Sequence, residues 1–311
     1  MPIWKSAAQQ VWKPALRGFD AIKRITGTGM KIIDTHQHLL FPDRLRYSWC
    51  KGLPAFEGKQ LGLPEYRASA EGTGIAETVF MEVDVDEPDI GAEAKFILGL
   101  ASDPQSKIAG VIAACRPEQP GFGKKTEPLL HPKLKGFRRV LHTQPDGVME
   151  MPLFAENLAW LGKHNLTFDL CVLPRQLSAG ARLVRAVPNL QFVLDHCGIP
   201  NIKGGELDPW RERIRELASF PNLACKISGV VAYSDPARVD AASIRPFVEH
   251  CIECFGWDRV LFGGDWPVCN LTSSIGDWVR IAREIVGSES IERQEKLFSR
   301  NAERIYRLST K

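Results

Sequence analysis

The sequence has no long uninterrupted apolar run, although 44% of its 311 residues are hydrophobic. No stretch reaches the roughly 18 residues that a membrane span needs. The N-terminus also lacks the compact apolar centre and small-residue cleavage site of a secretory signal. These absences predict a cytoplasmic protein, and the length suits one large core.

An excess of charge of one sign is also missing. The chain carries 40 Lys and Arg against 37 Asp and Glu, a net charge of +3. The two signs are mixed along the chain, so the sequence does not indicate a surface for a polyanion. We therefore expect no nucleic-acid partner.

The eight cysteines do not form a zinc-binding pattern, because the pair Cys251 and Cys254 has no second pair to complete a site. Several cysteines lie in apolar runs, where a thiol behaves as a small hydrophobic group. The sequence also shows no low-complexity segment and no internal repeat beyond an alternation of strand-like and helix-like segments. Packing in a reducing cytoplasm is the interpretation that we favour.

Residues 1–29 differ from the rest of the chain. Apolar residues recur there at three- and four-residue steps, with most basic residues off that stripe, which predicts a basic amphipathic helix. Docking on the following domain is our favoured role for it. Contact with an anionic membrane surface stays open, as does an extension upstream of a start at Met30. We divide the chain into this extension, 1–29, and one domain, 30–311, and expect the extension to be dispensable for chemistry.

The remainder alternates between short apolar runs and helix-like segments. This alternation predicts a parallel α/β sheet, and eight runs match the (β/α)8 TIM barrel. The predicted strands are the run around Ile32–Gln37 and Thr78–Met81, Ile108–Ala114, Leu134–Phe137, Thr167–Leu173, Gln191–Leu194, Leu223–Ile227 and Arg259–Phe262. The predicted helices include Gly91–Leu100, Pro152–Lys163, Gln176–Val187, Trp210–Ala218 and Ile244–Cys254.

The first strand ends in His36 and His38. In an extended chain this spacing puts both imidazoles on the same side, where they converge on one point. Such a pair suits a metal ion, or a reacting water held without one. The alternative is that one histidine packs in the core while the other is solvated. Barrel enzymes place their chemistry at the carboxyl ends of their strands, which favours the functional interpretation.

Two later strands end in the same way. The sixth is followed by Asp195 and His196, and the eighth by two glycines and Asp265. At the barrel mouth a carboxylate such as Asp265 can bind a metal or take a proton from water. The alternatives are that His196 packs in the core and that Asp265 caps the next helix. We expect Asp195 to orient a neighbouring side chain.

Further polar and aromatic residues are candidates for substrate binding. An arginine at a strand end can hold a carboxylate, a carbonyl oxygen or hydroxyls in a fixed geometry, although we expect one of the two neighbouring arginines to point away. A lysine can donate to substrate oxygens or extend to solvent. Aromatic residues of the loop 41–65 can cover a ligand or form a satellite core. The candidates are Trp49, Glu82, Arg138, Arg139, His142 and Lys226.

These motifs together resemble the amidohydrolase superfamily, of the amidohydrolase-related family 2 type. The motifs are His36-x-His38, Gly136-Phe137-Arg138, Asp195-His196-Cys197-Gly198, Cys225-Lys226-Ile227-Ser228-Gly229, Gly263-Gly264-Asp265-Trp266-Pro267 and the closing Asn301 to Leu308. The resemblance covers residues 31–309. It is closest to the sugar-lactone hydrolases, which include L-fuconolactonase, L-rhamnonolactonase and 2-pyrone-4,6-dicarboxylate lactonase.

The resemblance implies a distorted (β/α)8 barrel that hydrolyses a small lactone. By that comparison Asp265 activates the water, and His36, His38 and His196 surround it or hold a metal with Asp265. Arg138 would contact the substrate. The implied cofactor is one divalent cation, zinc first, and a reaction without metal stays open. No residue on the fourth strand offers a bridge for a second ion.

The sequence departs from the fuconolactonase pattern at Arg139, where those enzymes tend to have a histidine. An arginine at this position would favour a more anionic ligand. Two other functions remain open. The same residues would serve a zinc-dependent non-oxidative decarboxylase, and a non-catalytic sugar-acid binding barrel would keep the arginines. A homo-oligomer also stays open. The favoured partner is a small-molecule lactone.

Overall fold

The computed structural model describes residues 29–308. The predicted amphipathic helix of residues 1–29 therefore lies outside the described residues except for Gly29. Among residues 29–308, none of the helices has both the length and the apolar character needed to cross a membrane.

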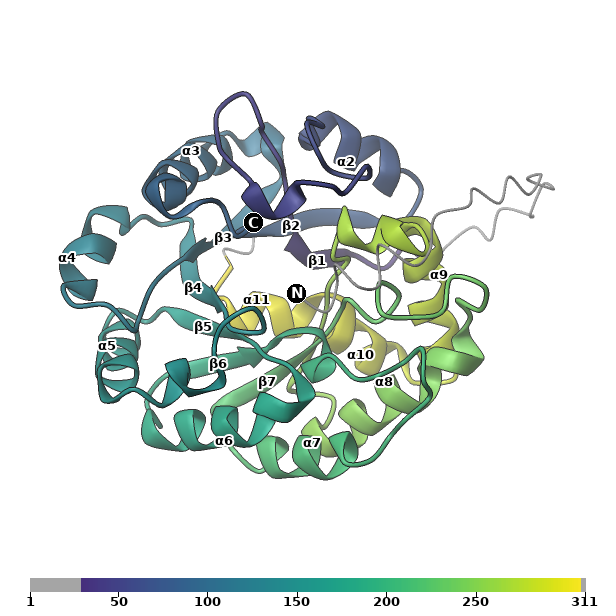
Figure 1. The fold of residues 1–311 in the computed structure, drawn as a ribbon. Coiled ribbons are helices and arrows are strands. Elements are labelled where there is room, and N and C mark those ends of the chain that lie inside the picture. The colour runs from purple at the N-terminus through teal and green to yellow at the C-terminus, as the bar shows by residue number, and fades with distance from the viewer. Residues whose placement is uncertain (1–28, 309–311) are drawn as a thin grey trace.

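Eight parallel strands follow one another around a ring in chain order, which confirms the predicted (β/α)8 barrel (Figure 1). The ring closes where the Asp265 amide donates to the His36 carbonyl and the His38 amide donates to the Trp266 carbonyl, both at 2.8 Å. The strands are β1 (Ile32–Gln37), β2 (Ile75–Met81), β3 (Ile108–Ala114), β4 (Leu134–Val140), β5 (Thr167–Cys171), β6 (Gln191–Leu194), β7 (Leu223–Ile227) and β8 (Val260–Phe262).

Helices surround this ring on the outside (Figure 1). They are α2 (Leu63–Ala70), α3 (Ile90–Ser102), α4 (Phe122–Thr126), α5 (Pro152–Lys163), α6 (Leu177–Ala186), α7 (Trp210–Ala218), α8 (Ala241–Phe255) and α9 (Ile275–Val286), and the chain continues with α10 (Ile291–Glu295) and α11 (Asn301–Ile305). The sequence had predicted α5 and α7 with these bounds. It had missed α2, because Pro64 looked like a loop residue. Pro64 stands in the first turn of α2, where a proline is well tolerated.

The inside of the barrel has an apolar layer at the amino ends of the strands. We call Ile33, Val79, Ile112, Val193, Ala224 and Leu261 the lower layer; all six are buried and belong to one cluster. The C-terminal segment closes the barrel below them, since Ala302, Ile305, Tyr306 and Leu308 join the same cluster. In Figure 1, α11 lies across the middle of the ring of strands. The barrel is thus a packed core that opens at its other end.

Cys251 of α8 is fully buried, and its sulfur lies within 4.8 Å of the sulfurs of Cys197 and Cys225. Cys254, one helical turn on, is partly exposed and contacts His250. The two members of the C-x-x-C pair therefore face different surroundings.

Candidate active site

A pocket of about 860 Å³, including its open mouth, lies at the carboxyl ends of the strands. Side chains from widely separated parts of the chain line it, as a barrel mouth requires. Six residues singled out from the sequence are among them, namely His38, Trp49, Arg138, His142, His196 and Asp265.

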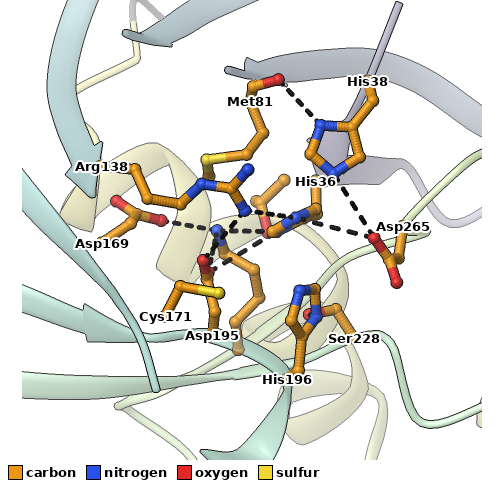
Figure 2. A network of polar contacts seen from close by, with 12 residues as sticks. His36, His38, Met81, Arg138, Asp169, Cys171, Asp195, His196, Ser228 and Asp265 are labelled. Atoms are coloured by element: carbon orange, nitrogen blue, oxygen red, sulfur yellow. Dashed lines mark hydrogen bonds and ion pairs between the residues drawn. The ribbon is translucent and has the colours of Figure 1, made fainter. Parts of the chain in front are cut away.

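His38 and Asp265 face each other at the floor of the pocket (Figure 2). His38 Nδ1 lies 2.9 Å from the Met81 carbonyl oxygen, so this nitrogen carries the hydrogen and Nε2 presents its lone pair. The Asp265 carboxylate lies 3.5 Å from His38 Nε2 and 3.7 Å from His36 Nε2. One carboxylate oxygen and two ring nitrogens thus surround one small volume.

The backbone at these strand ends is unusual. Asp84, His196 and Asp265 have φ values of 48°, 55° and 57°, in the left-handed region that side chains other than glycine rarely adopt. All three line the pocket. Such conformations persist where the surrounding structure holds them, and they concentrate at functional sites. Here they turn each side chain toward the pocket.

Two glycines leave space that site side chains occupy. A Cβ atom on Gly229 would lie 2.4 Å from His196 Nδ1, and one on Gly264 would lie 2.5 Å from an Asp34 carboxylate oxygen. Asp34 accepts from the Gly264 amide at 2.6 Å and from the Tyr66 hydroxyl at 2.7 Å. The segment that carries Asp265 is therefore held by β1.

Arg138 extends from β4 toward the histidines (Figure 2). The carboxylates of Glu82 and Asp195 hold it in place. Its Nε donates to Glu82 Oε1 at 2.6 Å, and one terminal nitrogen donates to the Glu82 carbonyl at 2.6 Å. The other terminal nitrogen lies 3.2 Å from His36 Nε2 and 3.4 Å from Asp195 Oδ2. This last nitrogen is the part of the guanidinium least committed to the protein.

Below Arg138 lies a second buried ion pair. Lys226 is fully buried, and its Nζ contacts Asp169 Oδ2 at 2.6 Å and Asp195 Oδ1 at 3.0 Å. The Tyr306 hydroxyl donates to the same Asp169 oxygen at 2.7 Å. We call Arg138, Asp169, Asp195 and Lys226 the charged layer. It connects the closing segment below the barrel to the site above.

The surroundings shift the protonation of these groups. Burial lowers the pKa of His36 well below its ordinary value, and burial likewise lowers the pKa of His196. Burial with the nearby Arg138 charge lowers the pKa of His142 to about 3. Burial alone would raise the pKa of Asp195, but Lys226 and His36 hold it well below its usual range. The three histidines are therefore neutral at pH 7, and Asp195 is ionised.

Comparison with known proteins identifies the family. A family model described as amidohydrolase matches residues 33–308. The chain belongs to the amidohydrolase family. An L-fucono-1,5-lactonase from Burkholderia multivorans is 30% identical to this amidohydrolase over 292 residues, which cover 89% of this chain and 96% of that protein.

Two further comparisons agree. An L-rhamnono-gamma-lactonase from Scheffersomyces stipitis is 24% identical over 205 residues, 56% of this chain and 59% of that protein. A solved amidohydrolase from Burkholderia multivorans with bound zinc has a TM-score of 0.79 at 28% identity, covering 89% of this chain and 99% of that one. The family resemblance inferred from the strand-end motifs is thus confirmed, and the protein is a hydrolase of the amidohydrolase superfamily.

Four sequence-predicted site residues of this amidohydrolase do not line the pocket. His36 lies just beneath it and is fully buried. Glu82 and Lys226 were predicted to bind substrate, but their charges are engaged by Arg138 and by the two carboxylates of the charged layer. Arg139 was expected to favour an anionic ligand, but it pairs with Glu118 at 2.8 Å outside the pocket lining. Alternation along β4 sends the neighbours Arg138 and Arg139 to opposite faces of the sheet.

Sequence reasoning missed three residues of the site. Tyr233 lines the pocket beside His196, with ring centroids 6.3 Å apart. It lies in the loop after β7, and no periodic pattern marks it. Asp169 was hidden inside an apolar run. Asp84, just past the end of β2, was not among the candidates, although it lines the pocket.

The donor set fits one divalent metal ion. His36, His38 and Asp265 place a ligand atom each within 4.8 Å of one another, and three protein ligands with an open position are typical of catalytic zinc. His38 also has the carbonyl support that orients metal-binding histidines. A bound ion would take the His36 Nε2 lone pair, so the Arg138 nitrogen that now lies 3.2 Å from Nε2 would turn away from it. The same guanidinium disfavours a second cation beside the first.

Proposed function

We propose that this amidohydrolase opens the ring of a small lactone by water attack on the ester carbonyl, with Asp265 as general base. The position of the Asp265 carboxylate at the pocket floor, 3.5 Å from His38 Nε2 and 3.7 Å from His36 Nε2, carries the proposal. The lactonase names of two relatives support it.

The first step is activation of water. A water near Asp265 can donate to its carboxylate while contacting His38 Nε2, which presents a lone pair. Proton transfer to Asp265 leaves hydroxide, which attacks the lactone carbonyl. The left-handed backbone at Asp265 and the contacts of Asp34 hold the carboxylate in one orientation, which limits reorganisation during the step.

The tetrahedral oxyanion needs a hydrogen-bond donor. The Arg138 terminal nitrogen that faces His36 has only the longer contacts of 3.2 and 3.4 Å, so it can turn to the oxyanion while Glu82 retains the other two nitrogens. A fixed charged donor of this kind stabilises charge that develops in the transition state.

Collapse of the intermediate breaks the ring C–O bond. The alkoxide leaving group takes the proton that Asp265 received, either directly or through His196 at the pocket wall, which can pass a proton on. Lactone plus water thus gives one hydroxy acid, which ionises and releases one acid equivalent. Asp265 returns to its carboxylate form.

We propose zinc as the ion for this site, with His36, His38 and Asp265 as its ligands and His196 at its side. When bound, the ion would act as a Lewis acid on the carbonyl oxygen. The zinc named for the solved amidohydrolase supports this choice.

Non-oxidative decarboxylation is the alternative that the same histidines and Asp265 could serve. It would start from a carboxylate-bearing substrate and release carbon dioxide. Ring opening of a lactone releases acid but no carbon dioxide. Parallel measurement of both products over a lactone and acid panel separates the two reactions. A binding barrel without activity would give neither product.

The change Asp265→Asn tests the base. The amide keeps the shape and an oxygen but accepts no proton, so kcat should fall by about 10² to 10⁴ while substrate affinity changes little. The assay is acid release in a weakly buffered indicator solution. Asp43→Asn is the matched control, because Asp43 is exposed and outside the pocket lining. Wild-type turnover by Asp265→Asn would show that another group is the base.

A further inference from the structure

The wall of the pocket is mostly apolar. Trp49, Phe56, Val140, Val268 and Leu271 contribute to it. The rings of Trp49 and Phe56 meet edge to face with centroids 5.6 Å apart. The Trp49 indole nitrogen donates to the Val83 carbonyl at 2.7 Å. A ligand at this wall therefore meets hydrophobic surface.

The positive charges near the pocket are already paired. Among residues 29–308, Arg138 is the one lysine or arginine in the lining. It and the nearby basic side chains each have a carboxylate partner between 2.6 and 2.8 Å away. The pairs are Arg116 with Glu87, Arg138 with Glu82, Arg139 with Glu118, and Lys226 with Asp169. A carboxylate on a ligand would find among them no cation that lacks a carboxylate partner.

Asp84 adds negative charge to this pocket. It follows β2, lines the pocket, and its carboxylate makes no hydrogen bond within the described chain. Burial and the neighbouring Glu82 raise the pKa of Asp84 to about 6, while three arginines oppose that shift. At pH 7 and above, Asp84 is therefore ionised, and the carboxylates of Asp84 and Asp265 line the same pocket. They attract hydroxyl groups and repel a second carboxylate.

We propose that this pocket selects uncharged lactones against carboxylate-bearing ones, and that Asp84 is the residue that sets this preference. The inference rests on the proposed lactonase function and names its substrate class. The apolar part of the substrate lies against Trp49 and Phe56, and a hydroxyl group donates to Asp84. A ligand carboxylate at the same place would lose water without gaining a counter-charge, which costs affinity.

The test compares two γ-lactones that differ in one group. One is γ-valerolactone, and the other bears a carboxylate in place of its methyl group. Wild-type protein should show the higher kcat/KM for γ-valerolactone. Asp84→Asn should raise kcat/KM for the carboxylate lactone by about tenfold or more, as expected when repulsion between two nearby charges is relieved. The ratio of kcat/KM for the carboxylate lactone to kcat/KM for γ-valerolactone should therefore rise.

The variant is chosen so that it folds. Asparagine tolerates the left-handed backbone that Asp84 adopts, better than most other residues. Asp86→Asn is the control, because Asp86 lies two residues on, outside the lining, where it accepts hydrogen bonds from Ser48. It should leave the ratio of the two kcat/KM values unchanged.

Binding is also measured by calorimetry in the Asp265→Asn background, with and without Asp84→Asn. Absence of acid release from every lactone would refute the proposed function, but the charge preference would still be read from these affinities. Equal or better use of the carboxylate lactone by wild-type protein would overturn the inference. So would an unchanged ratio in Asp84→Asn.

Discussion

The lower layer and the charged layer lie next to each other inside the same barrel and are stabilised in opposite ways. They are two positions apart along the chain, as Val193 on β6 precedes Asp195 just past the end of that strand and Ala224 precedes Lys226 on β7. Side chains at this spacing point to the same face. In the lower layer, contact with any apolar neighbour of suitable volume is enough. In the charged layer, each group depends on particular partners.

The charged layer explains why a site can be rigid without a large apolar contact area. Asp195 receives both cations of the layer, with Lys226 at 3.0 Å and Arg138 at 3.4 Å. Its first oxygen also lies 3.5 Å from His36 Nδ1. One carboxylate thereby fixes the positions of a guanidinium, an ammonium and an imidazole. The proposed general base lies above this arrangement.

The largest effect should follow from Lys226→Met. Methionine fills a similar volume but leaves Asp169 and Asp195 without their shared ammonium group, and an uncompensated buried charge costs about 3–5 kcal/mol. The free energy of unfolding should fall by about that amount in denaturant titrations. Lys203→Met is the control, because Lys203 is exposed. A loss no greater than that of the control would mean that the ion pair contributes nothing to stability.

Leu261→Ala tests how much the packing of the lower layer contributes to stability. It empties part of the lower layer, so unfolding should become easier by about 2–5 kcal/mol. Leu261→Met keeps most of the volume and should cost less than about 1.5 kcal/mol. Both variants should keep the wild-type kcat when folded, because no residue of the lower layer lines the pocket. A large fall in kcat with intact folding would show that the two layers are coupled.

The sequence predicted the lower layer more readily than the charged layer. Apolar runs ending in Asp195, His196 or Asp265 reveal strands and their carboxyl ends, because period and polarity are local properties. The partner of a charge is not local. Lys226 and Asp169 are 57 residues apart, and Asp169 lies between Phe168 and Leu170, where nothing distinguishes it from a solvent-facing residue. Arg138 and Arg139 were equivalent until the face of β4 was known.

The unusual backbone of the site was also beyond sequence reasoning. In a sequence, glycine is the residue from which a left-handed backbone conformation is most readily predicted, and Gly229 does adopt one. Asp84, His196 and Asp265 adopt it without being glycine. Tertiary contacts impose these angles, as the hydrogen bond from the Asp265 amide to the His36 carbonyl illustrates. Motif resemblance found two of these residues, and Asp84 belonged to none of the motifs.

The smallest effect should come from Tyr306→Phe, which removes one hydroxyl from the junction of the two layers. The ring remains in the lower cluster, and Asp169 keeps Lys226 as a partner. A hydrogen bond to a charged group is worth about 1.5–3 kcal/mol, which sets the expected loss of unfolding free energy at pH 8.

The pH dependence of this loss identifies its origin. Burial raises the pKa of Asp169 to about 6, although Lys226 and the Tyr306 hydroxyl lower it. Above that pH Asp169 is ionised in the folded protein, and the hydroxyl stabilises its charge. As the pH falls through about 6, Asp169 becomes protonated in the folded state and the hydrogen bond weakens. The difference in stability between wild type and Tyr306→Phe should therefore be larger at pH 8 than at pH 5. A difference that is equal at both pH values would mean that Tyr306 acts through ring packing and belongs wholly to the lower layer.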